Sequence, residues 1–401
     1  MARASPATDT TAQDTTDVLP MNDFDWTASQ AGFDELLDEL CRADAYALDT
    51  EFHRERTFLP VLGLIQIATP ARIALVDPFA VDVRGLGKVF AEDGTCVMHA
   101  ASQDLEILEL DCGTVPARLF DTQIAALFCG YRTSSLARLV EGFLGVSLDK
   151  SGQLTDWTRR PLPQADLRYA AADVVHLLDL KEALAGALEE RGRLGWAEEE
   201  IERLRVKDRS APDPDTLWWK LRGKNKLNGR ARAVAQELTI WRYDEARRSN
   251  RPTRAVLSDM AVLALAQRPA KNEGQLRGVR NFDSRHFKHA EAILAAIQRG
   301  LNLPREALRM PPKKPENLPN AEAVISLCLT WLAQRASDED LDMTVLGTRE
   351  DVTHLVLGQS SRLGSGWRAT LVGDELASII DGTAALRVKG TRLELLDRAA
   401  K

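Results

Sequence analysis

The stretch Ala45-Tyr46-Ala47-Leu48-Asp49-Thr50-Glu51-Phe52 decides the fold, because it has the pattern of a buried strand that ends in two acids. Side chains two apart in a strand point to the same face, so Asp49 and Glu51 project together from one side of a sheet. Neighbouring carboxylates at the end of an apolar strand repel each other and are costly to desolvate. A divalent cation bound by oxygen would offset that cost, but acids at an exposed strand end would simply face water. The strand alone leaves both interpretations open.

Length and composition favour a multidomain protein in a reducing compartment. A chain of 401 residues with 44% hydrophobic content has room for about two to four domains with real cores. No stretch approaches the roughly 18 consecutive apolar residues that a membrane span needs. The 5 cysteines show no CxxC spacing, which predicts free thiols and no structural zinc. We expect a monomeric cytoplasmic protein with no membrane partner.

Charge is distributed unevenly along the chain. Between positions 215 and 299 there are 18 Lys or Arg against 8 Asp or Glu, although the whole chain carries −7. A basic block inside an acidic protein is typical of a surface that meets phosphate backbones.

Shifts in composition also predict the domain boundaries. Residues 1–20 contain no apolar segment and predict a disordered leader, so Met21 is a second candidate start. Proline-containing stretches at 210–215 and 310–315 predict linkers. The expected divisions are a leader at 1–20, a first domain at 21–210, a basic helical domain at 213–300, a linker at 301–317 and a second helical domain at 318–397.

The segments around the acidic strand predict an α/β domain. Apolar residues at helical spacing around Phe33 predict a helix before it, and the turn at 69–72 predicts a hairpin of two strands after it. Further along, Ser102 is placed to cap a helix with Asp104 in its first turn, which capping and the helix dipole would explain without catalysis. A long helix over about 164–191 would carry Tyr169 and Asp173 on one face.

Taken in order, these motifs resemble the ribonuclease D family, in the tyrosine-containing subclass of the DEDD 3′→5′ exonuclease superfamily. The resemblance runs over about residues 25–200 and departs only in having Gln103 where relatives often have Glu. It implies an α/β, RNase H-like exonuclease domain, with a mixed sheet flanked by helices. The matching stretches are Leu48-Asp49-Thr50-Glu51-Phe52, Leu62-Gly63-Leu64-Ile65-Gln66, His99-Ala100-Ala101-Ser102-Gln103-Asp104-Leu105, Asp156-Trp157, Arg160-Pro161-Leu162 and Tyr169-Ala170-Ala171-Ala172-Asp173-Val174.

The remainder of the chain resembles two HRDC domains, which are small all-α modules that bind nucleic acid. The first resemblance rests on Leu217-Trp218-Trp219-Lys220-Leu221 and on 247–252 and 276–280, and the second, degenerate one on 346–352 and 366–368. It implies that RNA is the partner of the basic domain. The candidate nucleic-acid contacts are Lys220, Lys224, Lys226, Arg247, Arg248 and Arg251.

The resemblance also implies an activity, namely 3′→5′ trimming of tRNA precursors and other structured RNAs with release of nucleoside 5′-monophosphates. Its catalytic residues would be Asp49, Glu51, Asp104, Tyr169 and Asp173, and the four acids would hold two Mg²⁺ or Mn²⁺ ions. Tyr169, with an ordinary pKa near 10, suits orientation of the attacking water better than proton abstraction. The candidates for holding the last nucleotide are Phe52, His53, Gln66 and Arg160.

Two other functions stay open. A DNA 3′→5′ exonuclease uses the same chemistry, which does not require a 2′-hydroxyl. The alternative of another class is a non-catalytic RNA-binding scaffold. The intact set of acids argues against it, because a scaffold would not need several carboxylates that repel one another. A helicase is excluded, since the sequence has no G-x-x-x-x-G-K-[ST] phosphate loop.

Overall fold

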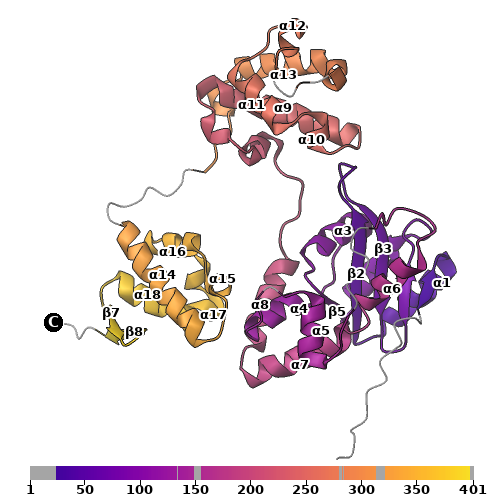
Figure 1. Cartoon of the computed structure of the whole chain (residues 1–401), viewed down its shortest axis with the longest axis vertical. Helices are drawn as coiled ribbons and strands as arrows, with labels where there is room; N and C mark the ends of the chain where they lie inside the picture. Colours follow the sequence, from indigo (N-terminus) through magenta and orange to yellow (C-terminus); the bar gives the residue numbers. More distant parts are fainter. Residues whose placement is uncertain are drawn as a thin grey trace, which may run out of the picture.

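The computed structural model describes residues 24–132, 134–148, 155–279, 282, 284–312 and 321–397. Along this chain an α/β domain is followed by two helical domains (Figure 1). The expected leader at 1–20 and the end of the expected linker, 313–317, lie outside the described residues. No helix in the described ranges is long and apolar enough to cross a membrane.

A mixed six-stranded sheet with the order β1-β4-β3-β2-β5-β6 forms the α/β domain. The acidic strand β2 lies inside it, antiparallel to β3 and parallel to β5. The predicted hairpin across 69–72 is confirmed as the antiparallel pair β3–β4. Strands β1 and β6 were not predicted, because each is only three residues long. The bounds are β1 (Asp25–Thr27), β2 (Ala45–His53), β3 (Val61–Ala68), β4 (Ile73–Val76), β5 (Thr95–Met98) and β6 (Leu119–Asp121).

Successive side chains of β2 point to opposite faces of the sheet and pack in two separate cores, one on each face. Tyr46 and Leu48 pack in the core that also contains α1 (Gln30–Leu40), η1 (Val83–Gly85), α2 (Leu86–Ala91) and α3 (Ser102–Cys112). Ala47 packs on the other face, which therefore also carries Asp49 and Glu51. That face is covered by α4 (Thr122–Phe128), α5 (Leu136–Leu144), α6 (Gln164–Ala172), α7 (Leu177–Glu190) and α8 (Leu194–Arg205).

The predicted continuous helix over 164–191 is wrong. Helix α6 ends at Ala172 and α7 begins only at Leu177. Between them the hydrogen-bond pattern changes from α-helical to 3₁₀-like. The Asp173 N–H donates to the carbonyl of Ala170, three residues earlier (3.3 Å), rather than to a carbonyl four residues earlier. No glycine or proline lies between positions 169 and 176, so nothing in the sequence marks this break. Asp173 is thereby the residue that caps the end of α6.

The first helical domain is built on one long helix, α9 (Gly229–Arg248), and has its own core around Trp218 and Leu238. Helix α13 (Ala290–Asn302) packs closely on α9 through Gly300, where an added Cβ would lie 2.5 Å from the Val234 Cα. The shorter elements are η2 (Pro214–Lys220), η3 (Lys224–Lys226), α10 (Thr253–Val256), α11 (Asp259–Gln267), α12 (Glu273–Leu276), η4 (Ser284–His289) and η5 (Arg305–Ala307).

The second helical domain contains a feature that was not predicted. It ends in an antiparallel hairpin of β7 (Ala384–Lys389) and β8 (Arg392–Asp397), so the all-α expectation holds only for its helical part. The predicted helices near 321, 349 and 374 are present. The bounds are α14 (Ala321–Asp338), α15 (Met343–Leu346), α16 (Arg349–Val356), η6 (Arg362–Gly364), α17 (Gly366–Arg368), the π-helical turn η7 (Ala369–Gly373) and α18 (Asp374–Ile380).

This second helical domain shares a continuous apolar core with the α/β domain. The Trp367 ring stacks on Trp196 of α8, with centroids 5.0 Å apart and planes within 14°. Beside it, the Arg368 side chain is only 1% exposed and forms an ion pair with Glu200 of α8. Burial would raise the pKa of Glu200, but the hydrogen bond and charge of Arg368 outweigh burial and lower it. The second helical domain is therefore fixed to the helices that support the sheet.

Replacing Arg368 with Ala should lower the free energy of unfolding by about 3 kcal/mol. It leaves the partly buried Glu200 carboxylate with only the longer contact to Arg203 (3.6 Å), and it leaves the buried carbonyls of Val345 and Leu346 without this donor. Urea unfolding of the full chain measures this. The double variant Arg368→Met with Glu200→Gln should recover most of the loss. Wild-type stability in Arg368→Ala would mean that this pair does not join the two domains.

Candidate active site

Three separate elements carry the four predicted acids. Asp49 and Glu51 come from one face of β2, Asp104 from the first turn of α3 and Asp173 from the end of α6. Thr50, between the two strand acids, donates a hydrogen bond of 2.5 Å from its Oγ1 to Oδ1 of Asp104, which ties α3 to β2. The fold thus brings residues from three distant segments to the end of one strand.

The pKa values show how strongly these carboxylates resist ionisation together. Burial raises the pKa of Asp49 well above its usual range, and the charges of Asp104, Asp173 and Glu51 add to the effect. Burial, followed by repulsion from Asp173 and Asp104, raises the pKa of Glu51 to about 8. Burial raises the pKa of Asp173 to about 7 and that of Asp104 to about 6. Protons or cations must therefore occupy this pocket near neutral pH.

Among the described residues, no three carboxylate, imidazole or thiol side chains already converge on one point closely enough to hold a metal ion. In this part of the chain, the site is a set of neighbouring acids that influence one another's ionisation.

Tyr169 lies beside the acids and is hydrogen-bonded to Asp173. Burial and then the charges of Asp173, Glu51 and Asp49 raise its pKa above that of an ordinary phenol. Its hydroxyl therefore keeps its proton at neutral pH and acts as a donor, as predicted for a residue that orients water.

Asp121 is a supporting residue that the sequence analysis did not assign to the site. Its buried carboxylate accepts the backbone N–H groups of Ala100 (3.3 Å) and Ala101 (2.8 Å), and also two N–H groups at the start of α4. It thereby fixes a turn in which Ala100 has a φ of 58° and from which α3 starts with Asp104 in its first turn. The predicted N-cap role of Ser102 is wrong, since Ser102 is already within α3. The only signal for Asp121 in the sequence was its position as an acid immediately before the helix α4.

The guanidinium of Arg160 is bonded within the protein and is not free to bind a substrate. Its side chain forms a two-point pair with Asp77 (2.8 and 2.7 Å) and donates to the carbonyls of Gly63, Trp157 and Arg159. All five N–H donors of the group are thus engaged by protein acceptors. We correct its predicted nucleotide-binding role to that of a positioning residue, which holds the 156–162 segment against β3.

The other three predicted nucleotide contacts lie in different surroundings. Gln66 pairs with Asp49 across the strands, and within the described chain its fully buried amide O and N have no hydrogen-bond partner. His53 continues the Asp49–Glu51 face, also with a buried, unpartnered Nε2. Phe52 lies on the opposite face, packed in the α1–α3 core. Gln66 and His53 therefore carry the unused polar groups that face the acids.

Comparison with known proteins supports the exonuclease family that the sequence motifs resemble. The 3′–5′ exonuclease family profile matches residues 24–189, and the HRDC domain profile matches residues 231–297. The ribonuclease D of Gluconacetobacter diazotrophicus is 35% identical over 90% of this chain and 93% of its own length. That of Acidiphilium cryptum is 34% identical over 90% of this chain and 94% of its own.

The crystal structure of Escherichia coli RNase D, described as an exoribonuclease involved in structured RNA processing, superimposes with a TM-score of 0.81. The similarity covers 90% of this chain and 99% of that one, at 28% identity. The family resemblance and the fold inferred from the motifs are confirmed, and the chain belongs to the ribonuclease D family of hydrolytic 3′→5′ exonucleases.

Proposed function

We propose that this protein trims the 3′ ends of tRNA precursors and other structured RNAs, releasing nucleoside 5′-monophosphates. The observation that carries the proposal is the gathering of four acids, one buried and three half-buried, with raised pKa values beside a neutral tyrosine. An RNA-binding scaffold gains nothing from such a costly arrangement. We further propose that it works as a monomer in the cytoplasm.

The donor set fits hard divalent cations. The exonuclease superfamily matched here generally uses divalent metal ions. We propose that Asp49, Glu51, Asp104 and Asp173 would hold two Mg²⁺ or Mn²⁺ ions, since carboxylate oxygens are the ligands these ions prefer. When bound, the pair would acidify a water molecule and stabilise charge on the departing 3′ oxygen.

The protein's own groups would place the substrate. Tyr169 keeps its proton, so its hydroxyl can donate to the attacking water or to a phosphate oxygen. The side-chain amide of Gln66 offers two N–H donors and one carbonyl acceptor, and its nitrogen and oxygen have no hydrogen-bond partner in the part of the chain that the structure describes. We propose that Gln66 and His53, on the face that carries the acids, bind the terminal nucleotide.

A time course on a 3′-extended tRNA, with and without EDTA, tests the activity. We expect stepwise shortening and mononucleotide release that stop when divalent ions are removed. Matched RNA and DNA oligomers separate the two nuclease hypotheses, because a DNA exonuclease would degrade the DNA strand faster. Binding without any mononucleotide release would favour the scaffold.

Replacing Gln66 with Met should stabilise the protein by about 1 kcal/mol and lower kcat/KM about tenfold, because it removes a buried amide that only the substrate satisfies. Denaturant unfolding and steady-state kinetics measure the two effects. The matched control is Gln236, which is equally buried but bonds Asp215, Ala307 and Arg309, so Gln236→Met should destabilise. Loss of stability in Gln66→Met would contradict a substrate-facing amide.

A further inference from the structure

Several of the arginines in the basic domain are already neutralised by acids of the same domain. Arg248 pairs with Glu245 at 2.7 Å, and Arg247 lies 3.6 Å from Asp244. Arg299 pairs with Glu237 at 2.8 Å. Two of the six predicted RNA contacts, Arg247 and Arg248, are therefore in part electrically compensated, and the positive surface must be sought elsewhere in the domain.

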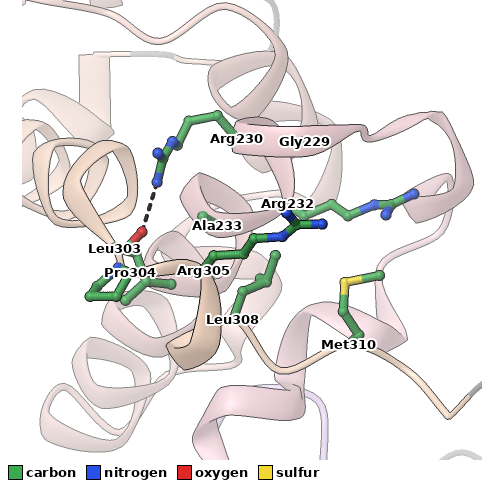
Figure 2. A pocket seen from close by; sticks show the side chains of 9 residues that line it. All are labelled: Gly229, Arg230, Arg232, Ala233, Leu303, Pro304, Arg305, Leu308 and Met310. Carbon is green, nitrogen blue, oxygen red and sulfur yellow. Dashed lines mark hydrogen bonds between the residues drawn. The ribbon is translucent and has the colours of Figure 1, made fainter.

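A cavity of about 430 Å³ at the start of α9 differs from these surfaces. Its wall combines the first turn of α9 with the segment that follows α13, and Figure 2 shows three arginine side chains, Arg230, Arg232 and Arg305, around it. No acidic side chain is among the described residues that line this cavity. The lining consists of Gly229, Arg230, Arg232, Ala233, Leu303, Pro304, Arg305, Leu308 and Met310.

The guanidinium groups in this cavity have spare donors. Arg230 gives one N–H to the Leu303 carbonyl (2.7 Å), and Arg232 gives its Nε–H to the Leu227 carbonyl (2.9 Å). The side chain of Arg305 forms no hydrogen bond or ion pair with any residue in the described part of the chain. Within that part of the chain, three positive charges therefore share one concave surface without an ion-pair partner, which favours the binding of an anion there.

The backbone adds to the positive potential. Helix α9 is 20 residues long, and the side chain of its N-cap, Asn228, makes no capping hydrogen bond. The positive end of its dipole therefore lies at the cavity, because residues of this uncapped first turn line it. Gly229 has a φ of 37°, and an added Cβ there would have no atom within 4 Å, so the approach to this first turn is open.

The rest of the lining is apolar, chiefly Leu303, Pro304, Leu308 and Met310. Cations beside an apolar wall suit a nucleotide, whose phosphate and base have these two characters. We propose that this cavity binds a phosphate and the adjoining nucleotide of the substrate RNA, upstream of the 3′ end held by the acids. This inference rests on the proposed function, and it places the main RNA contact of the basic domain at Arg230, Arg232 and Arg305.

The test compares full-length Arg232→Gln/Arg305→Gln with Arg299→Gln, which changes an arginine of the same domain that Glu237 neutralises. Fluorescence anisotropy in EDTA, where RNA stays intact, measures the affinity for a 3′-extended structured RNA at several salt concentrations. We expect the double variant to bind about tenfold more weakly, with a salt slope shallower by about 1 to 2. Arg299→Gln should stay within about twofold of wild type. Thermal melting confirms that both variants are folded.

Hydrolysis of a dinucleotide, which is too short to reach a second domain, should be unchanged in the double variant. Equal weakening in both variants would overturn the proposal, because it would indicate a general effect of charge. Unchanged RNA affinity in the double variant would also overturn the proposal. This holds even if AMP alone binds the cavity, because the cavity would then not contribute to RNA binding. Cavity-dependent RNA binding in a protein that hydrolyses nothing would leave the proposal standing and refute the proposed nuclease function.

Discussion

Asp49→Asn should lower the hydrolysis rate of 3′-extended RNA at least about a thousandfold while RNA affinity changes less than about twofold. The substitution keeps the shape of the side chain but removes one of the four carboxylates that we propose bind cations, and stabilisation of the transition state would depend on those cations. RNA binding is retained because the proposed contacts in the basic domain are untouched. Single-turnover hydrolysis and anisotropy measure the two quantities.

Asp166→Asn is the matched control for this experiment. Asp166 lies in the first turn of α6, the helix that is capped by Asp173. Its replacement therefore tests whether loss of any carboxylate in this region lowers the hydrolysis rate. It should retain activity within about twofold of wild type. Substantial turnover in Asp49→Asn would mean that the reaction does not depend on this carboxylate.

The stability of the metal-free protein should fall as pH rises from about 4 to about 8. The folded-state pKa values of Asp104 (about 6), Asp173 (about 7) and Glu51 (about 8) lie above those of the unfolded chain, near 4. The folded state therefore binds more protons than the unfolded state in this window, and the free energy of unfolding decreases with pH. Because one pKa unit corresponds to about 1.4 kcal/mol, the total loss should amount to several kcal/mol.

Saturating Mg²⁺ should remove most of this pH dependence, because cations then take the place of protons. Urea unfolding across the pH range, with EDTA or with Mg²⁺, measures it. Asp49→Asn should also flatten the metal-free curve. A metal-free protein whose stability rises between pH 5 and 8 would contradict the assigned electrostatics.

The sequence predicted the chemistry better than the geometry that supports it. Alternation along one strand was enough to place Asp49 and Glu51 on one face, and the ordered motifs brought in Asp104 and Asp173. The break after α6 was not predictable, since no glycine or proline marks it. Residues of α6 and α7 both pack in the core over the sheet, and local propensity does not encode such tertiary packing.

Side-chain partners from distant segments explain the other differences. Arg160 was predicted to help hold the last nucleotide, but the fold places Asp77 beside it. Arg247 and Arg248 were chosen as basic residues of the stretch that resembles an HRDC domain, and their own helix supplies the acids that compensate them. Arg305, which no motif distinguished, became a candidate only when the structure set it beside the start of α9.

The most direct test of the central claim, that acids from three separate segments form one cation site, is titration of Mn²⁺ into the metal-free protein by calorimetry. Wild type should bind about two ions per chain, and both Asp49→Asn and Asp173→Asn should lose at least one of them. Wild-type Mn²⁺ binding in either variant would contradict the claim, because the two carboxylates could not then share a metal site.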